Sequence, residues 1–270
     1  MRRPQKRLRL PLFVLTKREK FLISTAISTS GLLATQLVPF DMRHEMVIGL
    51  SVVSFITSAW ALREDMHGVE WFTLLVLPTL YTAAVALFYF LLPVRWLTRL
   101  PTIVVFAVGM YALLLTENIF NVAAQRSIQL VRAGQSIGML ITLVTAFLFF
   151  NTLLAFHLPS YINSIVAAAI AFPLALQSLW SVSLEPGSIS KTVWQYTLCT
   201  VLVIAQVMFV LSFWPVRGNI AALFMTALLY SFVGMGQQRL LERMFPNIMR
   251  ELIVVVIVVL ILMFTVTRWG

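Results

Sequence analysis

The chain has 270 residues and is strongly apolar, with 60% hydrophobic residues, 11% charged residues and a formal net charge of +10. Soluble domains carry about 25% charged residues, so this composition argues against a soluble globular domain and favours an integral membrane protein. The uncharged runs are continuous and do not alternate in polarity, which argues against a membrane β-barrel.

The first element is a basic segment, residues 1–20, whose single acid is Glu19. Cations that flank membrane spans are retained in the cytoplasm, so we expect the N-terminus to lie there. The apolar run that follows is a full span without a small-residue cleavage site, which predicts a retained helix and not a signal peptide. We therefore expect two parts, the basic segment and a single transmembrane domain, residues 21–270. The cations of the segment are Arg2, Arg3, Lys6, Arg7, Arg9, Lys17, Arg18 and Lys20.

Uncharged runs then recur along the chain, most of them near the ~20 residues that cross a bilayer as a helix. They predict an all-α, polytopic bundle of nine transmembrane helices in the plasma membrane. With the N-terminus inside, nine spans place the C-terminus outside. The runs are Phe21–Phe40, Met46–Leu62, Trp71–Val94, Leu100–Thr116, Ala133–Leu184 (two spans divided at His157–Ser160), Thr192–Val216, Gly218–Leu240 (without its flanking glutamines and Arg239) and Leu252–Thr267.

The central stretch turns from apolar to polar without an internal proline. Pro101 fits the first turn of a helix and Gly134 fits its end, so we predict one continuous helix, residues 101–133. Such a helix is about 50 Å long, and its half beyond Glu117 is expected to leave the ~30 Å hydrocarbon core. At 100° per residue its polar side chains form one stripe, which is either functional or merely solvated. The stripe comprises Glu117, Asn121, Gln125 and Gln129.

The motif Thr116–Ala124, followed by Arg126, Arg132 and a helix that ends at Phe149–Thr152, resembles the middle of an uncharacterised family of multi-pass bacterial membrane proteins. The resemblance covers residues 116–152. It implies a membrane location, and it implies no activity, because that family has none assigned. It therefore identifies no catalytic residue.

Four arginines are candidate contacts for anionic lipid head groups. Arg126 and Arg132 lie on the predicted central helix, and Arg239 and Arg243 lie one helical turn apart in the last predicted cytoplasmic loop. Arginine binds phosphate through two parallel hydrogen bonds, so we expect the four to share one surface on the cytoplasmic leaflet. The alternative is that they only fix the orientation of the chain or pair with nearby acids.

No motif for a known chemistry is present in the sequence: there is no HExxH, Gly-rich phosphate loop, serine elbow or paired Asp motif. We predict no catalytic, cofactor-binding or metal-binding residues and no nucleic-acid partner. The first functional interpretation is a structural or partner-binding membrane subunit, with another membrane protein or a second copy as its partner. The alternatives are a solute transporter or channel, and a lipid-phosphate enzyme or flippase-like protein. Against the transporter, the predicted spans carry no carboxylate near mid-membrane.

Overall fold

The computed structural model describes residues 15–35, 42–64, 66, 68–92, 96–124, 129–185, 188–242 and 246–267. Within these ranges the chain forms nine α-helices and no β-strand, which confirms the predicted all-α class. The helices are α1 (Lys17–Ala34), α2 (Arg43–Leu62), α3 (Glu70–Leu91), α4 (Trp96–Ala123), α5 (Val131–Ala155), α6 (Ser160–Ser183), α7 (Lys191–Leu211), α8 (Gly218–Leu240) and α9 (Pro246–Val266).

Local signals in the sequence explain several helix ends. Thr16 begins α1 with a reciprocal cap, in which its hydroxyl accepts from the Glu19 backbone N–H and the Glu19 carboxylate accepts from the Thr16 N–H at 2.7 Å. Ser190 caps α7 by accepting a hydrogen bond from the Val193 N–H. Leu184 ends α6 in the left-handed conformation, with φ 45°.

Most of the helices suit a bilayer in length and composition. In the described part of the chain, eight helices, α2 to α9, are long and apolar enough to cross a membrane. Helix α1 does not meet the same criterion, because its 18 described residues begin with the charged turn Lys17–Lys20. The span predicted at Phe21–Phe40 continues into residues 36–40, which lie outside the described ranges.

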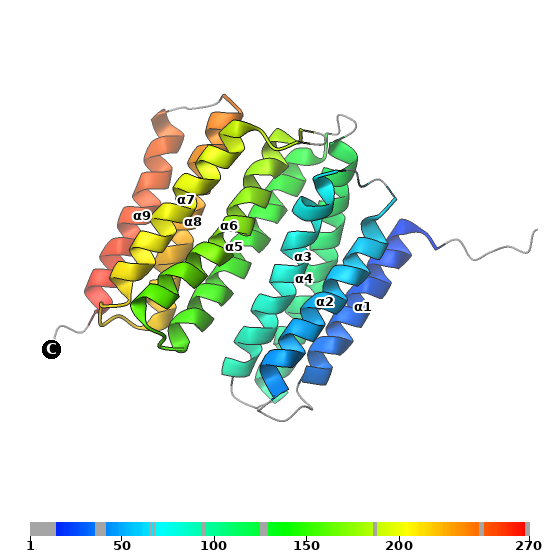
Figure 1. The fold of residues 1–270 in the computed structure, drawn as a ribbon, viewed down its shortest axis with the longest axis horizontal. Helices are drawn as coiled ribbons and strands as arrows, with labels where there is room; N and C mark the ends of the chain where they lie inside the picture. Colours follow the sequence, from blue (N-terminus) through cyan, green and yellow to red (C-terminus); the bar gives the residue numbers. More distant parts are fainter. Residues whose placement is uncertain are drawn as a thin grey trace, which may run out of the picture.

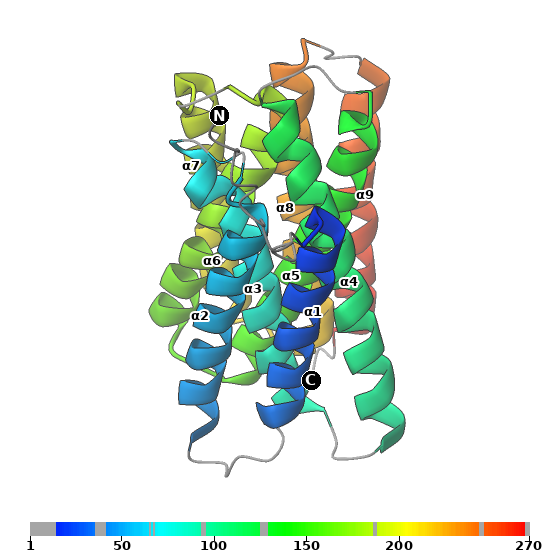
Figure 2. The ribbon, with the colours of Figure 1, turned by 90° about the vertical axis from the view of Figure 1, so that its right-hand side faces the viewer.

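The helices pack side by side as two four-helix groups (Figure 1). In the first group α1 contacts α2, α2 contacts α3, α3 contacts α4, and α4 closes back on α1. The second group repeats this order from α5 to α8, and α9 packs against α8. Contacts of α3 with α5 and α6, and of α4 with α5, join the groups. Consecutive helices run antiparallel, so α1, α3, α5, α7 and α9 all begin at one end, the upper end in Figures 1 and 2, which we call the Lys17 end.

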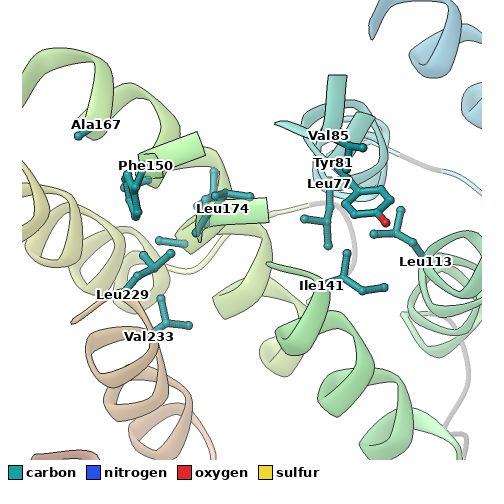
Figure 3. Close-up of a cluster of buried hydrophobic side chains, with 14 of the residues drawn as sticks. Leu77, Tyr81, Val85, Leu113, Ile141, Phe150, Ala167, Leu174, Leu229 and Val233 are labelled. Atoms are coloured by element: carbon teal, nitrogen blue, oxygen red, sulfur yellow. The ribbon is translucent and has the colours of Figure 1, made fainter. Parts of the chain in front are cut away.

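Buried apolar side chains form one core that extends through both groups. Figure 3 shows its two parts: Phe150, Leu174 and Leu229 meet among α5, α6 and α8, while Tyr81 and Leu113 meet beside α5. Tyr81 stacks on Phe106, with 5.4 Å between ring centroids. Close van der Waals contact of this kind, and not water exclusion, is what holds helices together within a bilayer.

The prediction of one continuous helix over residues 101–133 is wrong. Helix α4 ends at Ala123, Gln129 and Leu130 form a turn, and α5 begins at Val131 and runs back alongside α4. Gly134 does not end a helix. It lies in the second turn of α5, where an added Cβ would stand 3.3–3.4 Å from side-chain atoms of Ile119 and Phe120. The glycine therefore permits close approach of α5 to α4.

Candidate functional site

Several polar side-chain bonds between helices lie toward the Lys17 end. At the outermost level, Lys20 of α1 forms an ion pair with Glu64, just beyond α2. Asn121, near the end of α4, donates from Nδ2 to the Leu62 carbonyl at 3.2 Å and so ties α4 to the last turn of α2. Because such bonds are directional, they fix the relative positions of the helix ends more strictly than apolar packing does.

Glu117 is fully buried within α4. Gln177 of α6 donates from Nε2 to Glu117 Oε1 at 3.0 Å, so this bond crosses from the first four-helix group to the second. Glu117 Oε2 and the neighbouring Asn121 Oδ1 are buried and have no hydrogen-bond partner among the described residues. Glu117 lies six positions before Ala123, the last residue of α4, and so about 9 Å from the end of this apolar helix.

Of the two interpretations of the polar stripe, functional or merely solvated, the solvated one does not describe two of its four members. Glu117 and Asn121 both have 0% exposed surface. Gln125 lies outside the described residues, and Gln129 is exposed in the turn before α5. The structure does place one carboxylate inside a membrane-compatible helix, since Glu117 belongs to the apolar segment Leu97–Ala123, but nearer to its end than to its middle.

A polar cleft of about 970 Å³ opens at the Lys17 end, between the beginning of α5 and the ends of α6 and α8. Binding pockets for small molecules commonly have volumes of about 300–1,000 Å³. Gln238 lies near the end of α8 and Tyr230 lies about 12 Å further along its axis, so the cleft extends over about two turns of α8. The lining residues are Gln129, Val131, Arg132, Gln135, Ser136, Met139, Val182, Tyr230, Gln237, Gln238 and Leu241.

Two glutamines of the cleft are held against α6. Gln135 of α5 donates from Nε2 to the Ser181 carbonyl at 3.2 Å. Gln237 of α8 donates from Nε2 to the Ser178 carbonyl at 3.0 Å and to the Ser178 hydroxyl at 3.1 Å. A backbone carbonyl oxygen can only accept a hydrogen bond. These contacts therefore fix the orientation of both glutamine amides, with Nε2 toward α6. The walls of the cleft are thus oriented by the backbone of α6.

Of the four predicted head-group arginines, the structure describes two. Arg132 is exposed and lines the cleft, and Arg239 is exposed in the last turn of α8, outside the lining. Helices α5 and α8 are in contact, so both arginines lie at the Lys17 end of the same helix pair. Arg126 and Arg243 lie outside the described residues.

Metal-ligating side chains do not cluster in the part of the chain that the structure describes, where no group of three or more His, Cys, Asp or Glu occurs. The sequence reasoning missed Gln135, Gln177, Tyr230 and Gln237. The signal that could have identified the glutamines is their presence inside otherwise apolar helices, where polar side chains usually face the interior and meet a partner.

The fold and the cleft define, for the described residues, an all-helical bundle with membrane-compatible helices and a polar cleft. The chain belongs to the family described as "Protein of unknown function (DUF5656)", whose match spans residues 22–266. The family is uncharacterised, as the resemblance predicted from residues 116–152 implied. The match covers far more of the chain than those residues. No curated protein and no solved structure matches the chain.

Proposed function

We propose that this protein is a multi-pass protein of the plasma membrane that binds the anionic head group of a lipid in the cleft at its Lys17 end. In this proposal the nine helices, within a single domain of residues 21–270, cross the bilayer. The Lys17 end faces the cytoplasm, because the basic segment 1–20 precedes it. The cleft then opens at the level of the inner leaflet, where anionic lipids gather.

The observation that carries the proposal is the position of Arg132 on a cleft whose lining is part polar and part apolar. Gln129, Arg132 and Ser136 contribute polar groups, and Met139 and Val182 contribute apolar surface. A phospholipid has the same division between a charged head and a hydrocarbon body. The guanidinium is permanently charged and can donate two parallel hydrogen bonds to a phosphate.

The test is the substitution Arg132→Gln in the full-length protein, purified in mild detergent and titrated with anionic phospholipid under native mass spectrometry. A charge-assisted hydrogen bond is lost, so the affinity should fall about tenfold or more. Arg217→Gln is the matched control, because Arg217 is an exposed arginine before α8 at the opposite end of the bundle. Equal lipid affinity in Arg132→Gln and the unchanged protein would contradict the proposal.

A structural or partner-binding role is the second candidate, and the peripheral position of α9 favours it. Helix α9 packs against α8, and many of its large side chains, including Ile253, Val258 and Ile261, remain exposed. Lipid tails can cover this exposed apolar face just as a partner helix can. The face of α9 therefore supports a partner-binding role less strongly than the cleft supports lipid binding. The partner-binding role would be supported if a second protein or a second copy copurified with this chain. Replacing exposed residues of α9 should then abolish the copurification.

A further inference from the structure

The oriented glutamines determine which groups a ligand must present to the cleft. The Nε2 atoms of Gln135 and Gln237 are engaged by carbonyls of α6, so each amide retains Oε1 as its acceptor. No hydrogen bond to either Oε1 is formed within the described part of the chain, and both side chains line the cleft. An amide oxygen in this position accepts a hydrogen bond from a bound hydroxyl or ammonium group.

The two amides are anchored close together on α6. Their anchoring carbonyls belong to Ser178 and Ser181, three residues apart, which corresponds to about 4.5 Å of helical rise. Both acceptors therefore belong to one part of the cleft wall, as a small polyol with two hydroxyls requires. Because hydrogen bonds to α6 already hold both amides, a ligand does not have to immobilise them on binding.

The charges favour a hydroxyl over an ammonium group. The lining residues in the described ranges include Arg132 and no carboxylate. A cationic ammonium would therefore meet neutral oxygens beside a guanidinium, without a counter-charge. A hydroxyl donates to the same oxygens and carries no charge that the guanidinium repels.

We propose that the cleft selects a phospholipid whose anionic phosphate carries a hydroxylated substituent, of the phosphatidylglycerol type. The phosphate lies at Arg132, and the hydroxyls donate to Oε1 of Gln135 and Gln237. This inference rests on the proposed function and adds the chemistry of the head group to it.

The experiment compares lipids with identical acyl chains by native mass spectrometry of the full-length protein. Phosphatidylglycerol is the hydroxylated probe, and phosphatidylmethanol has the same single charge without hydroxyls. Phosphatidylethanolamine supplies an ammonium group. The unchanged protein should bind phosphatidylglycerol about tenfold more tightly than phosphatidylmethanol, as expected for two neutral hydrogen bonds.

The double variant Gln135→Met/Gln237→Met should reduce this preference to about twofold or less, because it weakens phosphatidylglycerol binding more than phosphatidylmethanol binding. Gln206→Met, the same change on α7, is the control and should keep the preference. If the double variant does not fold, the single variants and the lipid comparison on the unchanged protein decide the question.

The outcomes separate the two proposals. If Arg132→Gln weakens both anionic lipids but the unchanged protein does not distinguish them, the head-group inference is wrong and the proposed function stands. Tighter binding of phosphatidylethanolamine than of phosphatidylglycerol would also overturn the inference. If Arg132→Gln weakens neither anionic lipid, both proposals are wrong.

Discussion

At the scale of single residues, Glu117 is an acid buried inside an apolar helix. Its carboxyl is fully buried, accepts one hydrogen bond from Gln177 and has a second oxygen without a partner among the described residues. A buried carboxylate costs several kcal/mol if it is ionised without a counter-charge. Buried ionisable groups inside transmembrane helices are often functional, so Glu117 is the residue where a transport role would be sought.

Substitution of Glu117 separates a structural role from a functional requirement for charge. Glu117→Gln keeps an acceptor for the Gln177 amide and should leave thermal stability in detergent nearly unchanged. Glu117→Leu leaves that buried amide without its acceptor and should lower the free energy of unfolding by about 1–3 kcal/mol. Thermal unfolding of both purified variants measures the difference. Equal destabilisation by Gln and Leu would mean that the carboxylate charge itself is required.

At the scale of helices, the uncharged runs predicted the number and order of the elements well. Each predicted span overlaps one helix among the described residues, because a run of apolar residues is itself the physical requirement for a helix in a bilayer. The failure lies after Thr116, where polar residues were interpreted as an exit from the hydrocarbon core. Polar side chains in a helix face either water or a polar partner on another helix, and the local sequence is the same in both cases.

The corrected arrangement of α4 and α5 predicts the reactivity of single cysteines in membranes. Asn121→Cys, buried against α2, should react slowly with a water-soluble maleimide. Gln129→Cys, exposed in the turn before α5, should react fast. A continuous helix with a wetted stripe would instead make the two positions similar. The endogenous Cys199 of α7 is exposed and must first be replaced by serine.

The cleft itself was only partly predictable. Arg132 was identified from its charge, which the sequence displays directly. Gln135 and Gln237 lie on helices that are far apart in the chain, and their role depends on backbone carbonyls of α6. Hydropathy and periodicity describe one helix at a time, so they carry no information about such a contact.

At the scale of the whole molecule, the antiparallel course of the nine helices that the structure describes places the beginning of α1 and the end of α9 at opposite ends of the bundle (Figure 2). With the N-terminus in the cytoplasm, reporter fusions after Arg132 and after Arg268 should report opposite sides of the membrane, cytoplasmic and external respectively. Alkaline phosphatase and green fluorescent protein fusions measure the two sides. Reporters on the same side at both positions would contradict the proposed topology.

The closed first group has a consequence for the order of assembly during synthesis. Helices α1 to α4 can complete their mutual contacts before α5 leaves the ribosome, since α4 closes back on α1. Glu117 belongs to that early group, but its donor, Gln177, is 60 positions later in the chain. A nascent chain that holds only the first group therefore contains a buried acid without its donor. Arrival of α6 supplies a hydrogen bond to Glu117 Oε1 and couples completion of the second group to stability of the first.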